Sequence, residues 1–141
     1  MMKKVIGLIL MVVLCLSLCA CGDSESNAPL TDYVGVWVRE EWTNVKTGAV
    51  VNVTVYLYED GLFKEETRDS INGYEEVQGT WEIDKDTIVL RPTKLVAGTD
   101  SLHFDENGNL LEGVSNYRTI LSIIDKLTLE NGGNKYHKVL D

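Results

Sequence analysis

Hydrophobic and polar residues alternate strictly along residues 50–59, the most regular pattern in the chain. Valine or leucine occupies every second position there, and polar or aromatic side chains lie between them. Successive side chains of a β-strand point to opposite faces, so this period of two predicts a strand with one buried face. Less regular segments of the same kind predict further strands over residues 33–42, 62–69, 74–83, 87–91, 95–104, 117–124, 127–130 and 135–140.

Turn-forming residues separate these segments. Asp60-Gly61 predicts a two-residue hairpin turn with positive φ at both positions. Asn107-Gly108 predicts a second turn rather than a calcium loop, because its glycine lies too early for such a loop. Pro92 is expected to end its strand, since proline has no N–H to donate to a sheet. Short strands joined by short turns indicate an all-β, antiparallel up-and-down meander.

An almost unbroken apolar run, residues 5–18, precedes the strands and follows Lys3 and Lys4. A basic start, an apolar stretch and a small residue before a cleavage point are typical of a secretory signal. The run is shorter than the roughly 20 residues that a membrane-spanning helix needs. The order therefore predicts export and argues against a permanent transmembrane helix.

The residues that close this run, Leu18-Cys19-Ala20-Cys21, resemble the lipobox of bacterial lipoproteins. The resemblance implies cleavage after Ala20 and lipidation of Cys21, which would attach the protein to a membrane through acyl chains. The expected location is the cell membrane, facing the extracytoplasmic side, with the cell surface of a single-membrane bacterium favoured. Three parts are expected: a lipoprotein signal peptide (1–20), a flexible tether (21–30) and a single β-barrel domain (31–141).

Composition then narrows the chemistry of the mature chain. The three cysteines and three methionines all lie within residues 1–21, so the mature chain has one cysteine and no methionine. An internal disulfide, a thiolate metal cluster and a Met-rich copper site are therefore excluded, and no metal or cofactor is expected. Removing Lys3 and Lys4 leaves 11 basic and 22 acidic residues, a net charge of −11. This charge argues against binding to nucleic acid or anionic lipid headgroups.

Candidate catalytic groups are few. His103 and His137 are possible ligands or bases, but alone they define no site. No serine lies in a glycine-flanked elbow that would mark a nucleophile. The glutamate pairs are sequence neighbours, so on strands their side chains point to opposite faces and are expected to be solvated: Glu40-Glu41, Glu65-Glu66 and Glu75-Glu76. We therefore do not expect an enzyme.

The strand and turn motifs together resemble the small lipocalin-like domains of bacterial lipoproteins. The motifs that carry this resemblance are Gly35-Val36-Trp37, residues 57–63 and 79–88, and the closing residues 126–129 and 136–139. The resemblance implies a closed barrel of about eight strands. It also implies that Trp37 lies at the closed end beneath a basic side chain, with Lys138 or Lys135 in place of the usual arginine.

Inward-facing residues of such a barrel would line any internal site. The candidate ligand-binding residues are Trp37, Val53, Val55, Phe63, Glu65, Gly79 and Trp81. Gly79 is expected to leave room inside, so the favoured function is a non-catalytic binding module for a small ligand. The mostly apolar wall makes apolar compounds the candidates. The alternative is an envelope structural or protein-interaction accessory whose barrel is filled by its own side chains.

Overall fold

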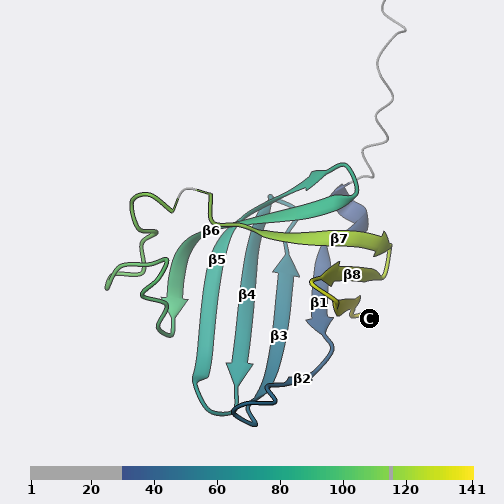
Figure 1. The fold of residues 1–141 in the computed structure, drawn as a ribbon. Helices are drawn as coiled ribbons and strands as arrows, with labels where there is room; N and C mark the ends of the chain where they lie inside the picture. The colour runs from purple at the N-terminus through teal and green to yellow at the C-terminus, as the bar shows by residue number, and fades with distance from the viewer. Residues whose placement is uncertain (1–29, 115) are drawn as a thin grey trace, which may run out of the picture.

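The computed structural model describes residues 30–114 and 116–141 (Figure 1). The predicted signal peptide, Cys21 and the tether up to residue 29 lie outside this described part. After the single 3-10 turn η1 (Leu30–Asp32), the regular elements are all strands: β1 (Gly35–Arg39), β2 (Trp42–Thr43), β3 (Val50–Leu57), β4 (Leu62–Asp69), β5 (Gly73–Asp84), β6 (Thr87–Ala97), β7 (Thr119–Asp125), β8 (Thr128–Asn131) and β9 (Asn134–Lys138). Within residues 30–114 and 116–141, no helix has the length and apolar character to cross a membrane.

The strands form one antiparallel sheet that closes on itself. From β3 to β9, each strand pairs with the next one in the sequence, and β1 pairs with both β9 and β3. This closure makes an eight-stranded barrel of β1 and β3–β9, while β2 pairs only with the start of β3. Closing the sheet removes its edges, where unpaired backbone groups would otherwise be exposed. The predicted all-β, up-and-down, lipocalin-like barrel is confirmed.

The alternating pattern of β3 determines which of its faces lies inside the barrel. Val51, Val53, Val55 and Leu57 are buried, whereas the residues between them are partly or fully exposed. Inward side chains of the other strands meet them in one core, whose largest fully buried members include Trp37, Leu57, Ile88, Leu90, Leu121 and Leu129. The strand prediction from the period of two is therefore confirmed.

The hairpin between β3 and β4 is longer than predicted. The Tyr58 N–H donates to the Leu62 carbonyl at 3.0 Å, and the Gly61 N–H donates to the Tyr58 carbonyl at 3.1 Å. Gly61 has a φ of 79°, whereas Lys85 is the one non-glycine residue of the described chain with positive φ. The two-residue turn with positive φ at Asp60 is therefore wrong. The loop has three residues, and only its glycine adopts the left-handed conformation.

Strand β6 continues past Pro92, contrary to the expected stop. Gln78 on β5 faces Lys94 and Gly79 faces Pro92, so β6 carries one extra residue at this point. Such a bulge interrupts the regular hydrogen bonding and accommodates a proline that cannot donate. The predicted stop at Pro92 is wrong because a local bulge absorbs it.

The separate strand predicted over residues 95–104 is also wrong. Its first part belongs to β6, which ends at Ala97, and Gly98 follows with a φ of 96°. The described residues between Gly98 and β7 form turns and bends with two isolated bridges, Lys94 to Asn109 and Phe104 to Leu110. Phe104 is buried in the barrel core. This irregular segment therefore packs against the barrel instead of adding a strand to it.

Candidate functional site

The barrel interior changes character from one end to the other. We call the end at which η1 meets β1 the entry end. We call the opposite end the mouth, where the β4–β5 turn lies (Figure 1). Gly98 and Thr99, the first residues after β6, lie beside this turn. Apolar side chains fill the entry end, whereas charged and phenolic side chains gather toward the mouth.

At the entry end, Trp37 is fully buried, and both its indole N–H and the ammonium group of the neighbouring Lys138 are hydrogen-bonded. Its Nε1–H donates to the Tyr33 carbonyl at 2.9 Å, and the two rings lie 6.4 Å apart. Lys138 Nζ lies 5.7 Å from the centre of the Trp37 ring and donates to the Asp32 carbonyl at 2.8 Å. Lys135 is exposed on β9. The expected basic cap over Trp37 is confirmed, and Lys138 provides it.

The position of Lys138 explains why a glycine, Gly35, lies two residues before this tryptophan. A Cβ at Gly35 would lie 3.0 Å from Lys138 Cε, and the backbone there has a φ of 138°. A side chain would therefore crowd the lysine stem and strain the backbone. Glycine at this position lets Lys138 cross over Trp37.

The predicted apolar site residues lie in the packed core. Val53, Val55, Phe63 and Trp81 are all at least 95% buried, and they belong to the same cluster as Trp37. The expectation that Gly79 leaves room is wrong. A Cβ at Gly79 would collide with the Arg91 carbonyl oxygen and lie 2.7 Å from Phe63 Cε1. The space beside Gly79 is therefore occupied by the β6 bulge and a phenyl ring.

Phe63 and Gly79 also border a second hollow, of about 450 Å³. Most of the residues that line it belong to the outer face of β4, β5 and β6. Lys64, Thr80 and Lys94 belong to that lining. A role for any predicted site residue in binding a ligand remains a prediction.

Toward the mouth, the inward positions become polar. Seven side chains from β1, β4, β5, β9 and the segment after β6 influence one another here, and we call them the mouth cluster: Arg39, Glu65, Glu75, Asp100, His103, Tyr117 and Tyr136. Of these, Glu65 was among the predicted ligand-binding residues, and His103 was a possible ligand or base. His137 is instead exposed on the outside of β9, 2.8 Å from Glu40 Oε1. The two histidines do not form one site.

Strand register places the carboxylates of the cluster. Glu65 pairs with Val77 across β4 and β5, and Thr67 pairs with Glu75. Glu65 and Glu75 are therefore diagonal neighbours on the inner face, close enough for their charges to interact. Burial, and then the charge of Glu75, raise the pKa of Glu65, whereas Arg39 opposes this shift. The expectation of solvated glutamates is wrong for Glu65, whose carboxyl is largely desolvated, and holds in part for Glu75, which is only partly buried. Both side chains lie on the inner face because they alternate along their strands with outward residues.

The segment after β6 supplies the next part of the cluster. His103 Nδ1 lies 2.8 Å from Asp100 Oδ2, and the imidazole stacks on the Tyr117 ring at 3.9 Å with an interplanar angle of 9°. Burial raises the pKa of Glu75, Asp100 raises it further, and His103 opposes the shift. At Gly98, a Cβ would lie 3.0 Å from Glu75. The glycine thus lets this segment approach Glu75 closely.

Arg39 is the incompletely paired member of the cluster. Its Nε and Nη2 atoms are buried and have no hydrogen-bond partner among the described residues. Arg39 pairs in register with Tyr136 on β9, and burial raises the pKa of the Tyr136 phenol, with the charge of Glu65 raising it further. Leaving buried donors unpaired costs free energy, so most buried polar groups in folded proteins are paired.

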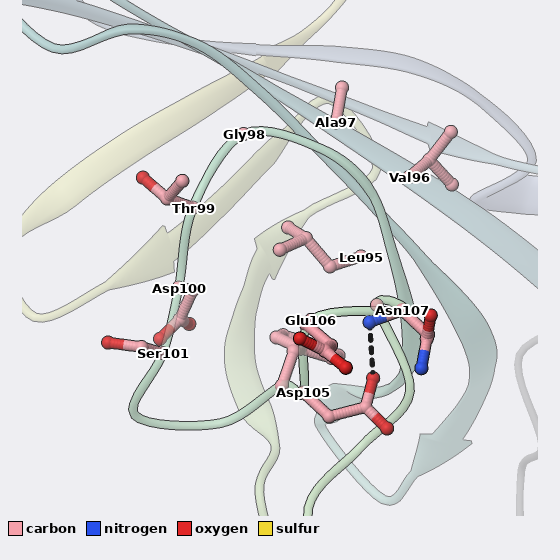
Figure 2. A pocket seen from close by; sticks show the side chains of 12 residues that line it. Leu95, Val96, Ala97, Gly98, Thr99, Asp100, Ser101, Asp105, Glu106 and Asn107 are labelled. Carbon is pink, nitrogen blue, oxygen red and sulfur yellow. Dashed lines mark hydrogen bonds between the residues drawn. The ribbon is translucent and has the colours of Figure 1, made fainter.

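Two hollows lie beside the segment after β6. One, of about 360 Å³, has Thr67, Glu75, Gly98 and Thr99 in its lining, together with Asp69, Asn72, Gly73 and Tyr74. The other, of about 400 Å³, is open to solvent and is lined by residues between Leu95 and Gly108 (Figure 2). Figure 2 shows this chain curving around the hollow, with Asp105 accepting a hydrogen bond from the Asn107 N–H at 2.8 Å. The carboxylate of Asp105 stabilises the predicted turn.

The described residues hold no group of three or more His, Cys, Asp or Glu side chains arranged to bind a metal ion. A scan against models of protein families and a search of curated proteins both find no match to the chain.

Sequence reasoning missed Arg39, Glu75, Asp100 and Tyr117 as members of one site. A signal for Arg39 was present, because it lies two positions after Trp37 and must share its face in a strand. Asp100 and Tyr117 carried no comparable signal, since they lie in an irregular segment whose path is determined by tertiary contacts.

Proposed function

We propose that the mature protein is a lipid-anchored, non-catalytic binding module that faces the extracytoplasmic side of the cell membrane and binds a small ligand at the mouth of its barrel. The observation that carries this proposal is the contrast inside the barrel. The entry end is filled by apolar side chains, and Trp37 and Lys138 there donate to backbone carbonyls, while the mouth cluster contains a buried arginine edge with no partner among residues 30–114 and 116–141. Such an edge is suited to a ligand with hydrogen-bond acceptors.

The position of the first described residues supports an outward-facing mouth. Leu30 to Asp32 lie beside the Lys138 cap at the entry end, and Lys126 Nζ contacts Asp32 Oδ2 at 3.2 Å. Cys21 precedes Leu30 by nine residues, which span at most about 30 Å when extended. An acylated Cys21 would therefore hold the entry end near the membrane and leave the mouth on the far side.

The anchor is tested by metabolic labelling with a fatty-acid analogue. Cys21→Ser should abolish the label and leave an unprocessed precursor, whereas Cys19→Ser should remain labelled and membrane-bound. Label persisting on the Cys21→Ser protein would overturn the lipoprotein assignment.

Binding is tested by thermal shift on the mature chain carrying Cys21→Ser, which retains every strand of the barrel. The screen compares fatty acids and isoprenoids with small charged metabolites. A ligand at a hundredfold excess over its Kd should stabilise the fold by about 2.7 kcal/mol. We expect stabilisation from charged compounds, because the apolar half of the interior is already occupied.

The alternative function, an envelope structural or protein-interaction accessory, is favoured by one observation: Gly79 leaves no space and apolar side chains fill the entry half. A screen in which neither apolar nor charged compounds raise the melting temperature would support this alternative over the binding module.

A further inference from the structure

Four exposed apolar side chains lie at the entry end, beside the first described residues of the chain. We call Leu30, Leu127, Val139 and Leu140 the entry patch, and their exposed fractions run from 47% to 68%. Single exposed leucines and valines are common on protein surfaces, but several of them at one place often mark a contact with another surface. The packing of the barrel itself does not account for this group.

Backbone hydrogen bonds bring three members of the entry patch together. The Lys138 N–H donates to the Leu127 carbonyl at 3.0 Å, which places the β7–β8 turn against the end of β9. Val139 is the next residue, and its N–H donates to the Val36 carbonyl of β1 at 2.8 Å. Leu140 follows directly. Leu127, Val139 and Leu140 therefore lie at one junction of β1, β8 and β9.

Two lysines connect η1, and with it Leu30, to this junction. Lys126 Nζ lies 3.2 Å from Asp32 Oδ2, and Lys138 Nζ donates to the Asp32 carbonyl at 2.8 Å. Leu30 lies two residues before Asp32 in η1. Figure 1 shows η1, the β7–β8 turn and the C-terminus on the same side of the barrel. The patch thus combines apolar side chains with lysines beside them, a combination that suits the boundary between water and lipid.

The position of Cys21 in the sequence indicates which surface the entry patch meets. Cys21 precedes Leu30 by nine residues, which span at most about 30 Å when extended. An acylated Cys21 would therefore keep the patch within that distance of the bilayer. A contact made over so short a link is intramolecular, so apolar contacts too weak to hold a free protein at the membrane are sufficient to orient an anchored one.

Charge determines which part of the bilayer the entry patch contacts. Without residues 1–20, and so without Lys3 and Lys4, the chain has a net charge of −11 and is repelled by anionic headgroups. Apolar side chains gain free energy by leaving water for the edge of the acyl region, whatever the headgroup charge. The expected contact is therefore apolar, and it is stronger on zwitterionic than on anionic lipid.

We propose that the entry patch docks on the membrane to which Cys21 is anchored, with its four apolar side chains at the boundary between headgroups and acyl chains. This inference rests on the proposed lipid anchor and adds an orientation to it. The barrel stands on its entry end, and its mouth points away from the membrane.

The test couples the mature chain to vesicles through Cys21, its only cysteine, and so does not depend on lipidation in a cell. The vesicles contain a maleimide-bearing lipid in phosphatidylcholine whose acyl chains are brominated near the headgroup. Leu127→Trp places a fluorescent reporter in the entry patch. Ile71→Trp is the matched control, because Ile71 is 60% exposed on the β4–β5 turn at the mouth. Relative to the coupled parent chain, the tryptophan at position 127 should lose fluorescence to bromine and shift its emission to the blue, and the one at position 71 should do neither.

Further substitutions test whether the apolar side chains cause the docking. Val139→Ser and Leu140→Ser, combined in the Leu127→Trp chain, should abolish the quenching, because the remaining patch is too small to stay at the interface. Val45→Ser in the same chain should leave the quenching unchanged, since Val45 is 94% exposed in the β2–β3 loop at the mouth. All of these side chains are exposed, so the melting temperature should stay at that of the parent, which excludes unfolding as the cause. Replacing part of the lipid with phosphatidylglycerol should reduce the quenching at low salt, and added salt should restore it.

Equal quenching of the two reporters would overturn the proposal, because the barrel would then have no preferred face toward the bilayer. Quenching of neither reporter would also overturn it and leave the entry patch available to a protein partner. Quenching that requires phosphatidylglycerol would replace apolar docking with headgroup binding by the lysines. The lipid anchor itself is tested by metabolic labelling of Cys21→Ser, which chemical coupling bypasses, so the two failures are distinguishable.

Discussion

The entry end and the mouth of this barrel are built on the same strands but handle their polar groups differently. At the entry end, Trp37 and Lys138 each donate to a backbone carbonyl, and the surrounding side chains are apolar. At the mouth, Arg39 lies only two residues from Trp37 on the same strand, yet two of its donors have no partner among the described residues. The entry end is therefore packed and hydrogen-bonded, whereas the mouth retains hydrogen-bond donors of Arg39 that no described residue accepts.

This difference predicts opposite effects on stability for two kinds of mutation, truncation of an apolar side chain and neutralisation of a charged one. Removing a side chain from the entry end should lower the free energy of unfolding, because packing contacts are lost without compensation. Neutralising a charge at the mouth should cost less or even stabilise the fold, because the mutual repulsion of the partly buried carboxylates and their desolvation would be relieved. Stability measurements can therefore test the contrast directly.

The largest expected effect is that of Trp37→Ala. Trp37 is fully buried and supports Tyr33 and the Lys138 cap, so its loss should cost about 3–5 kcal/mol of unfolding free energy. Urea unfolding monitored by circular dichroism measures this. Trp42→Ala is the matched control, because Trp42 is 45% exposed, and it should change stability by about 0.5 kcal/mol or less. Similar losses in both variants would contradict a packed entry end.

Gly79→Ala should have the next largest effect, about 1–3 kcal/mol of destabilisation, because the added methyl group collides with the Arg91 carbonyl oxygen. Thermal unfolding measures it. The Phe63 ring can move, but the carbonyl belongs to the backbone of β6. Phe63→Leu combined with Gly79→Ala should therefore fail to restore stability. If Gly79→Ala melts at the parent temperature, the space beside Gly79 is open to a side chain, as the sequence alone predicts.

The smallest expected effect is the pH dependence that Glu65 contributes. Burial and Glu75 raise its folded-state pKa above the ordinary value of 4.5, so the folded protein binds this proton more tightly than the unfolded chain does. Stability due to this group is then lost as the pH rises from about 4.5 through the raised pKa. Glu65→Gln should remove that loss, and its melting temperature should exceed the parent's by a margin that grows toward neutral pH.

The groups that face Glu65 are Glu75 on β5, Arg39 on β1, Tyr136 on β9 and Tyr117 before β7. Glu66→Gln is the control, because Glu66 lies on the outer face of the same strand and pairs with Lys64 at 2.7 Å. It should not show a stabilisation that grows with pH. A melting temperature of Glu65→Gln that falls below the parent's as the pH rises would show that Glu65 is stabilising in its ionised form.

Much of the fold could be predicted from sequence because its strands obey local rules. The alternation along β3, the glycine of the β3–β4 loop and the spacing between Gly35 and Trp37 are short-range features. The predictions that are wrong concern residues at which a long-range contact overrides a local preference. Pro92 would end an isolated strand, but the bulge opposite Gly79 accommodates it. The segment after Ala97 has strand-like residues, yet Gly98 turns it across Glu75.

The sequence by itself determined the all-β class, the order of the hairpins and the alternation that directs Arg39 and Glu65 inward, because side-chain direction in a strand has a period of two. Only the tertiary structure decided that residues from five separate parts of the chain meet at the mouth, and that one edge of Arg39 has no partner within the described part of the chain. Closure of the sheet brings β1 against β3 and β9. Such contacts depend on barrel curvature and on the path of an irregular segment, and no local pattern of residues encodes either.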